Sequence, residues 1–161
     1  MKSRIKNKII SLEGLEKEIR NAKQQGKTVV STSGCFDILH AGHVKYLEEA
    51  RAKGDILVVL LNSDRSVREL KGSSRPIVPE EERAVVIAGL ESVDYVCIFS
   101  DKTPCFIIER IQPDVVIKGG DYVGKQIPEM GSVAVYGGRV EYVDAVEGCS
   151  TTNIVERIKK Q

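Results

Sequence analysis

The chain has 161 residues, the size of one domain built around one hydrophobic core. Its 42% hydrophobic and 29% charged residues are typical of a globular protein and exclude a disordered or fibrous one. Lys and Arg number 24 against 23 Asp and Glu, so the formal net charge of +1 gives no general attraction to nucleic acid or to an anionic membrane. An anionic ligand therefore needs a local site.

We expect a cytoplasmic protein that binds neither membrane nor nucleic acid. No apolar run approaches the roughly 18 residues that span a bilayer, and residues 1–10 lack the apolar stretch and cleavage site of a signal peptide. The cysteines are scattered without a CxxC motif, at Cys35, Cys97, Cys105 and Cys149. This pattern predicts reduced thiols.

Short β-branched runs alternate with helical signals along the chain. The runs predict five strands, at residues 28–31, 56–61, 95–99, 115–117 and 140–143. Strands that alternate with helices are typical of a parallel sheet with helical crossovers. Runs that are apolar on both faces predict helices on both sides of that sheet. We therefore expect an α/β fold with a doubly wound, Rossmann-like, parallel five-stranded sheet, in which ligands bind beyond the carboxyl ends of the strands.

The helices are predicted from apolar spacing and end signals. Ser11 precedes a helix that ends at Gly26, so we expect an N-terminal helical extension over residues 1–26 and one folding unit over 27–161. We predict a second helix over 43–54 and a third that is opened by Pro79. A fourth helix has Thr103 as N-cap and Pro104 as first residue, and a last helix over 152–160 is capped by Ser150 or Thr151.

The loop after the first strand contains both histidines of the chain. His40 and His43 are three residues apart at a predicted helix start, with Gly42 between them. At this spacing both rings lie on one side of the first turn, where backbone N–H groups and the helix dipole favour an anion. Gly42 is expected to let a phosphate approach the backbone. The pattern predicts a phosphate cradle with two imidazole donors.

Three other interpretations remain open from local pattern alone. The histidines are also compatible with plain polar residues at a strand–helix junction, or with a zinc site that includes Cys35, although no fourth ligand has a recognisable spacing. Residues 119–126, GGDYVGKQ, match a P-loop pattern. That match lacks the final Ser or Thr, and Pro128 interrupts the helix that should follow.

The stretch GCFDILHAGH resembles the HxGH signature of the nucleotidyltransferases that include the cytidylyltransferases and pantetheine-phosphate adenylyltransferase. Further stretches, LLNSDRSVRELKGSSRPIVP, EERAVVIAGLESVDYV, PDVVIKGGDY and EGCSTTNIVERI, are similar to the D-glycero-β-D-manno-heptose 1-phosphate adenylyltransferases of ADP-heptose synthesis. The resemblance runs in order from Lys27 to Ile158.

The resemblance implies a reaction and its partners. Such an enzyme transfers AMP from ATP, with Mg²⁺, to a sugar 1-phosphate and releases pyrophosphate, giving ADP-heptose for lipopolysaccharide and other surface glycans. The phosphate oxygen attacks the α-phosphorus in line, so catalysis is positioning and electrostatics without a covalent intermediate. The resemblance also implies a homo-oligomer, and a heptose kinase supplied by a separate chain.

The resemblance assigns roles residue by residue. The implied catalytic residues are His40, His43 and Lys71, the last of which we place in a mobile Gly/Ser-rich loop with Arg75. The implied nucleotide-binding residues are Gly34, Cys35, Phe36, Asp37, Gly42, Lys118, Gly119, Gly120, Asp121, Ser150, Thr151 and Thr152. The implied substrate-binding residues are Asn62, Asp64 and Arg75.

Several of these residues also have purely structural interpretations. Asp37 is compatible with an Asx turn as well as with help in placing magnesium, so no residue is assigned as a metal ligand. The glycines of KGGDY are compatible with a simple turn, and Ser150 with a plain N-cap.

Two positions depart from the family pattern. Ser33 and Val78 stand where the family has Asn, which leaves the acceptor open. The alternatives are a related enzyme with another acceptor, such as a glycerol 3-phosphate cytidylyltransferase, and a nucleotide-binding module without catalysis.

Overall fold

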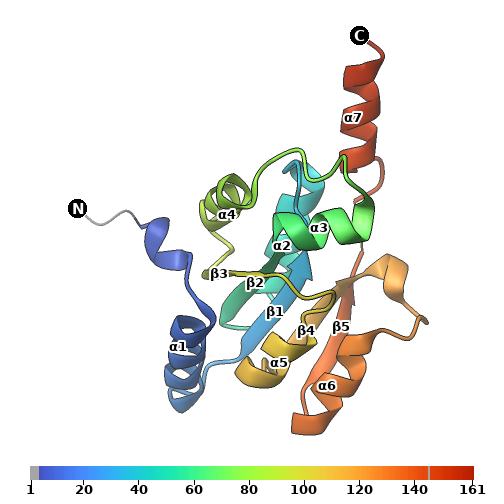
Figure 1. The fold of residues 1–161 in the computed structure, drawn as a ribbon. Coiled ribbons are helices and arrows are strands. Elements are labelled where there is room, and N and C mark those ends of the chain that lie inside the picture. The colour runs from blue at the N-terminus through green and yellow to red at the C-terminus, as the bar shows by residue number, and fades with distance from the viewer. Residues whose placement is uncertain (1–3, 145) are drawn as a thin grey trace.

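The computed structural model describes residues 4–144 and 146–161. Its centre is a five-stranded parallel sheet with the strand order β3-β2-β1-β4-β5 (Figure 1). The strands are β1 (Val29–Gly34), β2 (Ile56–Asn62), β3 (Tyr95–Phe99), β4 (Val115–Gly119) and β5 (Arg139–Val143). The predicted doubly wound parallel sheet is confirmed. Strands β1, β2 and β4 extend one to three residues further at their carboxyl ends than predicted.

Seven α-helices and two short 3₁₀ helices are formed by the described residues. The α-helices are α1 (Leu12–Gln24), α2 (Ala41–Arg51), α3 (Asp64–Lys71), α4 (Glu80–Ala88), α5 (Cys105–Ile111), α6 (Pro128–Tyr136) and α7 (Thr151–Lys159). The 3₁₀ helices are η1 (Lys6–Lys8) and η2 (Gly120–Tyr122). Helices α3 and α6 were not predicted from the sequence.

Two local predictions about helix ends are wrong. Pro104, rather than Thr103, is the N-cap residue of α5, and it makes no side-chain capping bond because proline has no polar side chain. Lys71 is the last residue of α3 rather than part of a loop, because Ser63 caps a helix that runs up to Gly72. By contrast, the Ser11 side chain accepts a hydrogen bond from the Gly14 N–H, so the predicted cap of α1 is confirmed.

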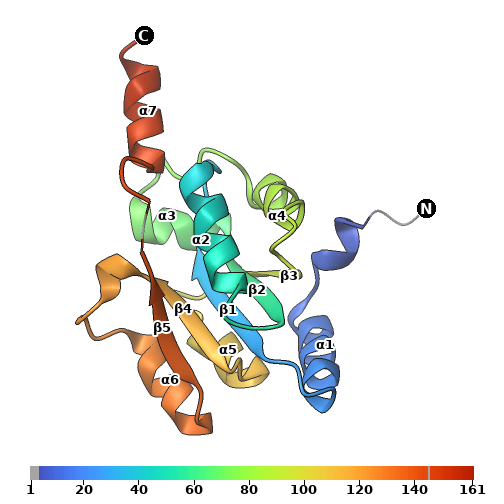
Figure 2. The same cartoon turned by 180° about the vertical axis from the view of Figure 1, so that it is seen from behind.

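Two helical layers cover the two faces of the sheet (Figure 2). Along each strand alternate side chains point to opposite faces. Val30, Leu57 and Val59 therefore pack with α2 and α4, and their neighbours Val29 and Val58 pack with α1, α5 and α6. The N-terminal helix α1 thus contributes to one of the two hydrophobic cores. No helix among the described residues is long and apolar enough to cross a membrane.

The strand order places a topological switch between β1 and β4. The chain leaves β1 toward β2 on one side, and later returns to pair β4 with the other side of β1. Such a switch leaves a crevice at the carboxyl ends of the strands, where ligands bind in open α/β sheets. In both views α7 projects away from this end of the molecule (Figures 1 and 2).

Candidate active site

The first cavity lies at the carboxyl end of β1 and has a volume of about 320 Å³. Its walls come from the loop after β1, the first turns of α2, the end of α3 and the start of α7. It is lined by Ser33, Gly34, Cys35, Phe36, Asp37, His40, Gly42, His43, Tyr46, Lys71, Val146, Cys149, Ser150 and Thr151. Segments more than 100 residues apart in the chain therefore meet around the histidine pair.

The two histidine rings are stacked, with centroids 3.9 Å apart and ring planes at 24°. His40 is the N-cap residue of α2, and its Nδ1 accepts a hydrogen bond of 3.1 Å from the Gly42 N–H. The neutral ring therefore carries its proton on Nε2, which is left to donate to a ligand. The Phe36 ring lies 5.3 Å from the His43 ring and packs beside it. The prediction that both rings lie together at the helix start is confirmed.

Burial disfavours the charged form of both histidines. Burial, helped by the nearby charges of His40 and Lys71, lowers the pKa of His43 to about 4. Burial also lowers the pKa of His40 below its ordinary value. Within the described residues, the buried Nδ1 of His43 has no hydrogen-bond partner. Such a pair is suited to donate hydrogen bonds to phosphate oxygens and to bind more tightly as negative charge develops there.

Gly42 has a packing role in this turn. A Cβ atom added to Gly42 would lie 2.8 Å from Cβ of Cys149 and 2.9 Å from the His40 ring. Only glycine therefore lets the loop before α7 approach α2 while His40 keeps its position. That Gly42 admits a phosphate stays a prediction; the atoms that require a glycine here are those of Cys149 and His40.

The N-terminus of α7 forms another wall of the first cavity. The Ser150 side chain accepts a hydrogen bond of 3.0 Å from the Asn153 N–H, so Ser150 is the N-cap residue. Ser150 and Thr151 both line the cavity, while Thr152 is exposed and lies outside the set of lining residues. A capped helix start directed at a cavity that already holds two imidazole donors adds a positive dipole end.

Asp37 joins two loops. Its carboxylate, which is almost fully buried, accepts hydrogen bonds from the backbone N–H groups of Ile77 and Val78 and from Nη1 of Arg75, at 2.8–2.9 Å. Burial opposes ionisation, but these donors outweigh it and hold the pKa of Asp37 below its ordinary value. Arg75 is therefore engaged by Asp37 instead of being held out in the cavity, which differs from its expected place beside the substrate.

Asp37 is also a poor candidate for a magnesium ligand, because both carboxylate oxygens are already taken by protein donors. In the parts of the chain that the structure describes, no three His, Cys, Asp or Glu side chains gather as a metal site.

Arg83 was not predicted from the sequence to lie near the site. Its side chain is fully buried on the sheet side of α4, and Nη1 donates to the carbonyl oxygens of Cys35 at 2.6 Å and Asn62 at 2.8 Å. Nε donates to the Val78 carbonyl, and Nη2 pairs with Asp64 at 2.7 Å. Asp64 is therefore a structural partner of Arg83. The spacing in the sequence could have indicated that Arg83 is buried, because it lies four residues before Ile87, on the same face of α4.

A second cavity of about 400 Å³ adjoins the first. Both cavities are lined by Ser33, Gly34, Cys35 and Lys71. The other residues around the second cavity are Asn62, Leu70, Phe99, Lys102, Thr103, Pro104, Lys118, Tyr122, Ile127, Pro128 and Glu129. The expected catalytic residue Lys71 is thus the one charged side chain of the described residues that borders both cavities.

The KGGDY segment lies differently from what we expected for a nucleotide pocket. Nζ of Lys118 forms an ion pair of 2.7 Å with Glu129 and lines the second cavity. Gly119, Gly120 and Asp121 are absent from the lining of both cavities. A Cβ atom at Gly120 would lie 2.6 Å from Oδ1 of Asp144, so this glycine permits a close approach to the chain after β5. Residues 120–122 form η2, and Pro128 opens α6, an arrangement unlike the helix that directly follows a P-loop lysine.

Three lining residues of the first cavity were not identified from the sequence, namely Tyr46, Val146 and Cys149. The Tyr46 hydroxyl lies 2.8 Å from Oγ1 of Thr32, and burial raises the pKa of Tyr46 to about 12. Tyr46 lies three residues after His43, one turn along α2, and this spacing could have placed it near the site.

Comparison with known proteins gives a consistent picture. Residues 31–157 match the family model described as cytidylyltransferase-like. The chain is 51% identical over 152 residues to the bifunctional protein HldE of Syntrophotalea carbinolica and 53% identical over 152 residues to that of Geotalea uraniireducens. Each match covers 94% of this chain and 31% of the relative, so the chain spans about a third of the length of these relatives.

Solved structures agree with the fold. The lipopolysaccharide core biosynthesis protein from Thermoplasma volcanium superposes with a TM-score of 0.61 at 29% identity, over 75% of this chain and 98% of that one. The pantothenate synthetase from Thermus thermophilus superposes with a TM-score of 0.61 at 17% identity, over 95% of this chain and 70% of that one, which shows a shared fold.

Proposed function

Because the chain belongs to the cytidylyltransferase-like family and is a nucleotidyltransferase, we propose that it transfers AMP from ATP to D-glycero-β-D-manno-heptose 1-phosphate. The products are ADP-heptose and pyrophosphate. The observation that carries this proposal is the stacked pair of His40 and His43, which forms one wall of a cavity with Lys71 and the start of α7. The relatives called HldE, and the lipopolysaccharide core biosynthesis protein of similar fold, support heptose as the acceptor sugar.

In the proposed reaction MgATP is a substrate whose phosphates bind in the first cavity. Nε2 of His40 donates to a phosphate oxygen, since its Nδ1 is already engaged by the Gly42 N–H. Lys71 and the N-terminus of α7 add positive charge on other walls of the cavity. The acceptor's phosphate oxygen attacks the α-phosphorus, the bond from that phosphorus to the bridging oxygen breaks, and pyrophosphate leaves.

Residues of the protein contribute positioning and electrostatic stabilisation. The neutral histidines and Lys71 are set in place before the substrate binds, so little reorganisation is needed as charge develops on the pentavalent phosphorus. Burial raises the pKa of the Cys35 thiol, so that group stays protonated and is a poor nucleophile. We therefore include no covalent cysteine intermediate in the proposed reaction, and the transfer is direct and in line.

The test is pyrophosphate release by the purified protein with MgATP, with and without the heptose 1-phosphate, and with ADP-heptose identified by mass spectrometry. CTP with glycerol 3-phosphate is the control pair. We expect release that requires both ATP and the heptose phosphate. Release that is equally strong with the control pair would contradict the assignment of base and acceptor, and binding of ATP without turnover would make the protein a nucleotide-binding module.

A further inference from the structure

The second cavity has no role in binding the nucleotide phosphates as described above. Because Ser33, Gly34, Cys35 and Lys71 line both cavities, a ligand in the second cavity lies directly beside a phosphate in the first. The second cavity is formed by the ends of β2 and β4, the loop after β3 and the first turn of α6. Its position therefore suits a second substrate that reacts with the first.

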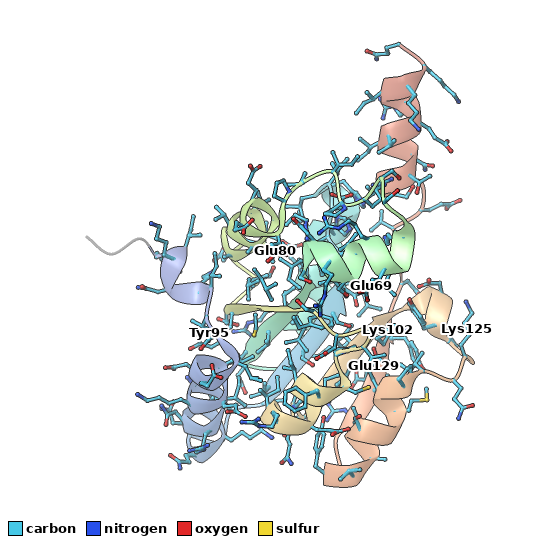
Figure 3. All side chains as sticks on the ribbon, in the orientation of Figure 1. Glu69, Glu80, Tyr95, Lys102, Lys125 and Glu129 are labelled. Atoms are coloured by element: carbon cyan, nitrogen blue, oxygen red, sulfur yellow. The ribbon has the colours of Figure 1, made fainter. Side chains whose placement is uncertain are left out.

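Charge in the second cavity is mixed. Lys71, Lys102 and Lys118 line it together with one carboxylate, Glu129. Figure 3 labels Lys102 and Glu129, which come from the loop after β3 and from α6 and border the same cavity at the carboxyl ends of the strands. Three cations attract an anionic group, while a carboxylate repels a phosphate and accepts hydrogen bonds from hydroxyls. This combination suits a ligand with a phosphate at one end and hydroxyls at the other.

The Lys118–Glu129 pair is unusually well buried. The Glu129 side chain is 4% exposed and that of Lys118 is 11% exposed, and Nζ and Oε1 are 2.7 Å apart. Nζ of Lys118 also lies 5.0 Å from the centroid of the Tyr122 ring. Within the described chain, Oε2 of Glu129 accepts no hydrogen bond, although the residue faces the cavity. A buried ion pair is seldom more stabilising than packed apolar side chains, so folding alone gives little reason for this pair.

We propose that the Lys118–Glu129 pair determines acceptor specificity, and that the second cavity binds a phosphorylated sugar. The phosphate of the sugar lies at Lys71 and Lys102, next to the nucleotide. The ring hydroxyls lie at the other end, where Oε2 of Glu129 accepts from a hydroxyl and Lys118 fixes the carboxylate. This inference rests on the proposed function for the identity of the acceptor.

The test is calorimetric binding to the full chain saturated with a non-hydrolysable ATP analogue. The probes are the heptose 1-phosphate, which carries ring hydroxyls, and inorganic phosphate, which does not. In Glu129→Gln we expect affinity for the sugar phosphate to fall at least about tenfold, as for one lost charge-assisted hydrogen bond, and affinity for inorganic phosphate to stay the same or rise. Affinity for the ATP analogue should stay within about twofold of wild type.

Four further variants make the result specific. Glu81→Gln, an exposed glutamate of α4, is the matched control and should bind both probes as the wild type does. If Glu129→Gln folds poorly because Lys118 is left without its partner, the double variant Lys118→Met/Glu129→Leu replaces both charges and should bind inorganic phosphate without preferring the sugar phosphate. Lys102→Ala should weaken both probes, and Lys17→Ala is its exposed control.

The outcomes separate the two proposals. Undiminished sugar phosphate binding by Glu129→Gln, an equal loss for the ATP analogue, or no sugar phosphate binding by the wild type would each overturn the role of the pair. Binding that depends on Glu129 in a protein that releases no pyrophosphate would instead overturn the proposed function and leave the binding site standing.

Discussion

The two cavities differ in how the chain builds them. The reactive side chains of the first cavity come mainly from one stretch, 33–46, in which His40 and His43 are separated by two residues. The second cavity is assembled from separate segments, with Asn62 at the end of β2, Lys102 after β3, Lys118 near the end of β4 and Glu129 in the first turn of α6. A phosphate cradle depends on backbone N–H groups and one helix start, so it is local. Recognition of a second molecule needs a surface that only several strand ends together provide.

Arg83 joins the two regions, and removing it should have the largest effect. Its guanidinium donates to Cys35 on one side and Asn62 on the other, and it pairs with Asp64. Arg83→Met leaves these buried acceptors without a donor, so the free energy of unfolding should fall by about 3–5 kcal/mol. Urea denaturation measures this, with the exposed Arg65→Met as control. A change as small as that of the control would show that the two loops hold their positions independently.

Loss of either histidine should lower catalysis at the first cavity without changing ligand binding in the second. His40→Ala and His43→Ala each remove a donor to the transferred phosphoryl group, so kcat should fall by about 100- to 1,000-fold. Sugar phosphate binding in calorimetry should stay near the wild-type value, and the melting temperature should confirm folding. Turnover near wild type in both variants would refute the role of the pair.

Lys71 borders both cavities, so its loss should weaken both substrates. A charged hydrogen bond contributes about 1.5–3 kcal/mol, and Lys71→Ala should therefore lower kcat/KM for ATP and for the acceptor by about 10- to 150-fold each. Lys45→Ala, on the exposed side of α2, is the control in the same steady-state assay. If only one substrate is affected, Lys71 belongs to one cavity alone.

The last expected effect is a pH dependence of stability at the first cavity. Burial lowers the pKa of His43 to about 4 in the folded chain, whereas an unfolded histidine titrates near 6.5. The unfolded state therefore takes up a proton first, and His43 reduces stability progressively as the pH falls from about 6.5 to about 4. Denaturation curves across this range should show a shallower decline in His43→Gln. Proton NMR that finds the His43 ring titrating near 6.5 in the folded protein would contradict this.

Sequence patterns predicted the five strands because each contains several β-branched or aromatic residues, and in β2 (Ile56–Asn62) the run is buried on both faces. The HxGH turn was also predictable, since the His40 cap and the stacking of the two rings depend on residues close together in the chain. Helix α3 was not predicted because its eight residues include only two large apolar side chains, Val67 and Leu70, which is too few to stand out as a helical pattern. Lys71 was consequently placed in a loop.

The sequence by itself determined the parallel sheet, the histidine turn and the family resemblance, because apolar patterning and helix starts are encoded over a few neighbouring residues. Only the tertiary structure decided that Asp37 holds Arg75 and the backbone at Ile77, that Arg83 holds Cys35, Asn62 and Asp64, and that Lys118 pairs with Glu129. These contacts link segments that meet through the strand order. Their hydrogen bonds depend on burial, which no local pattern of residues reveals.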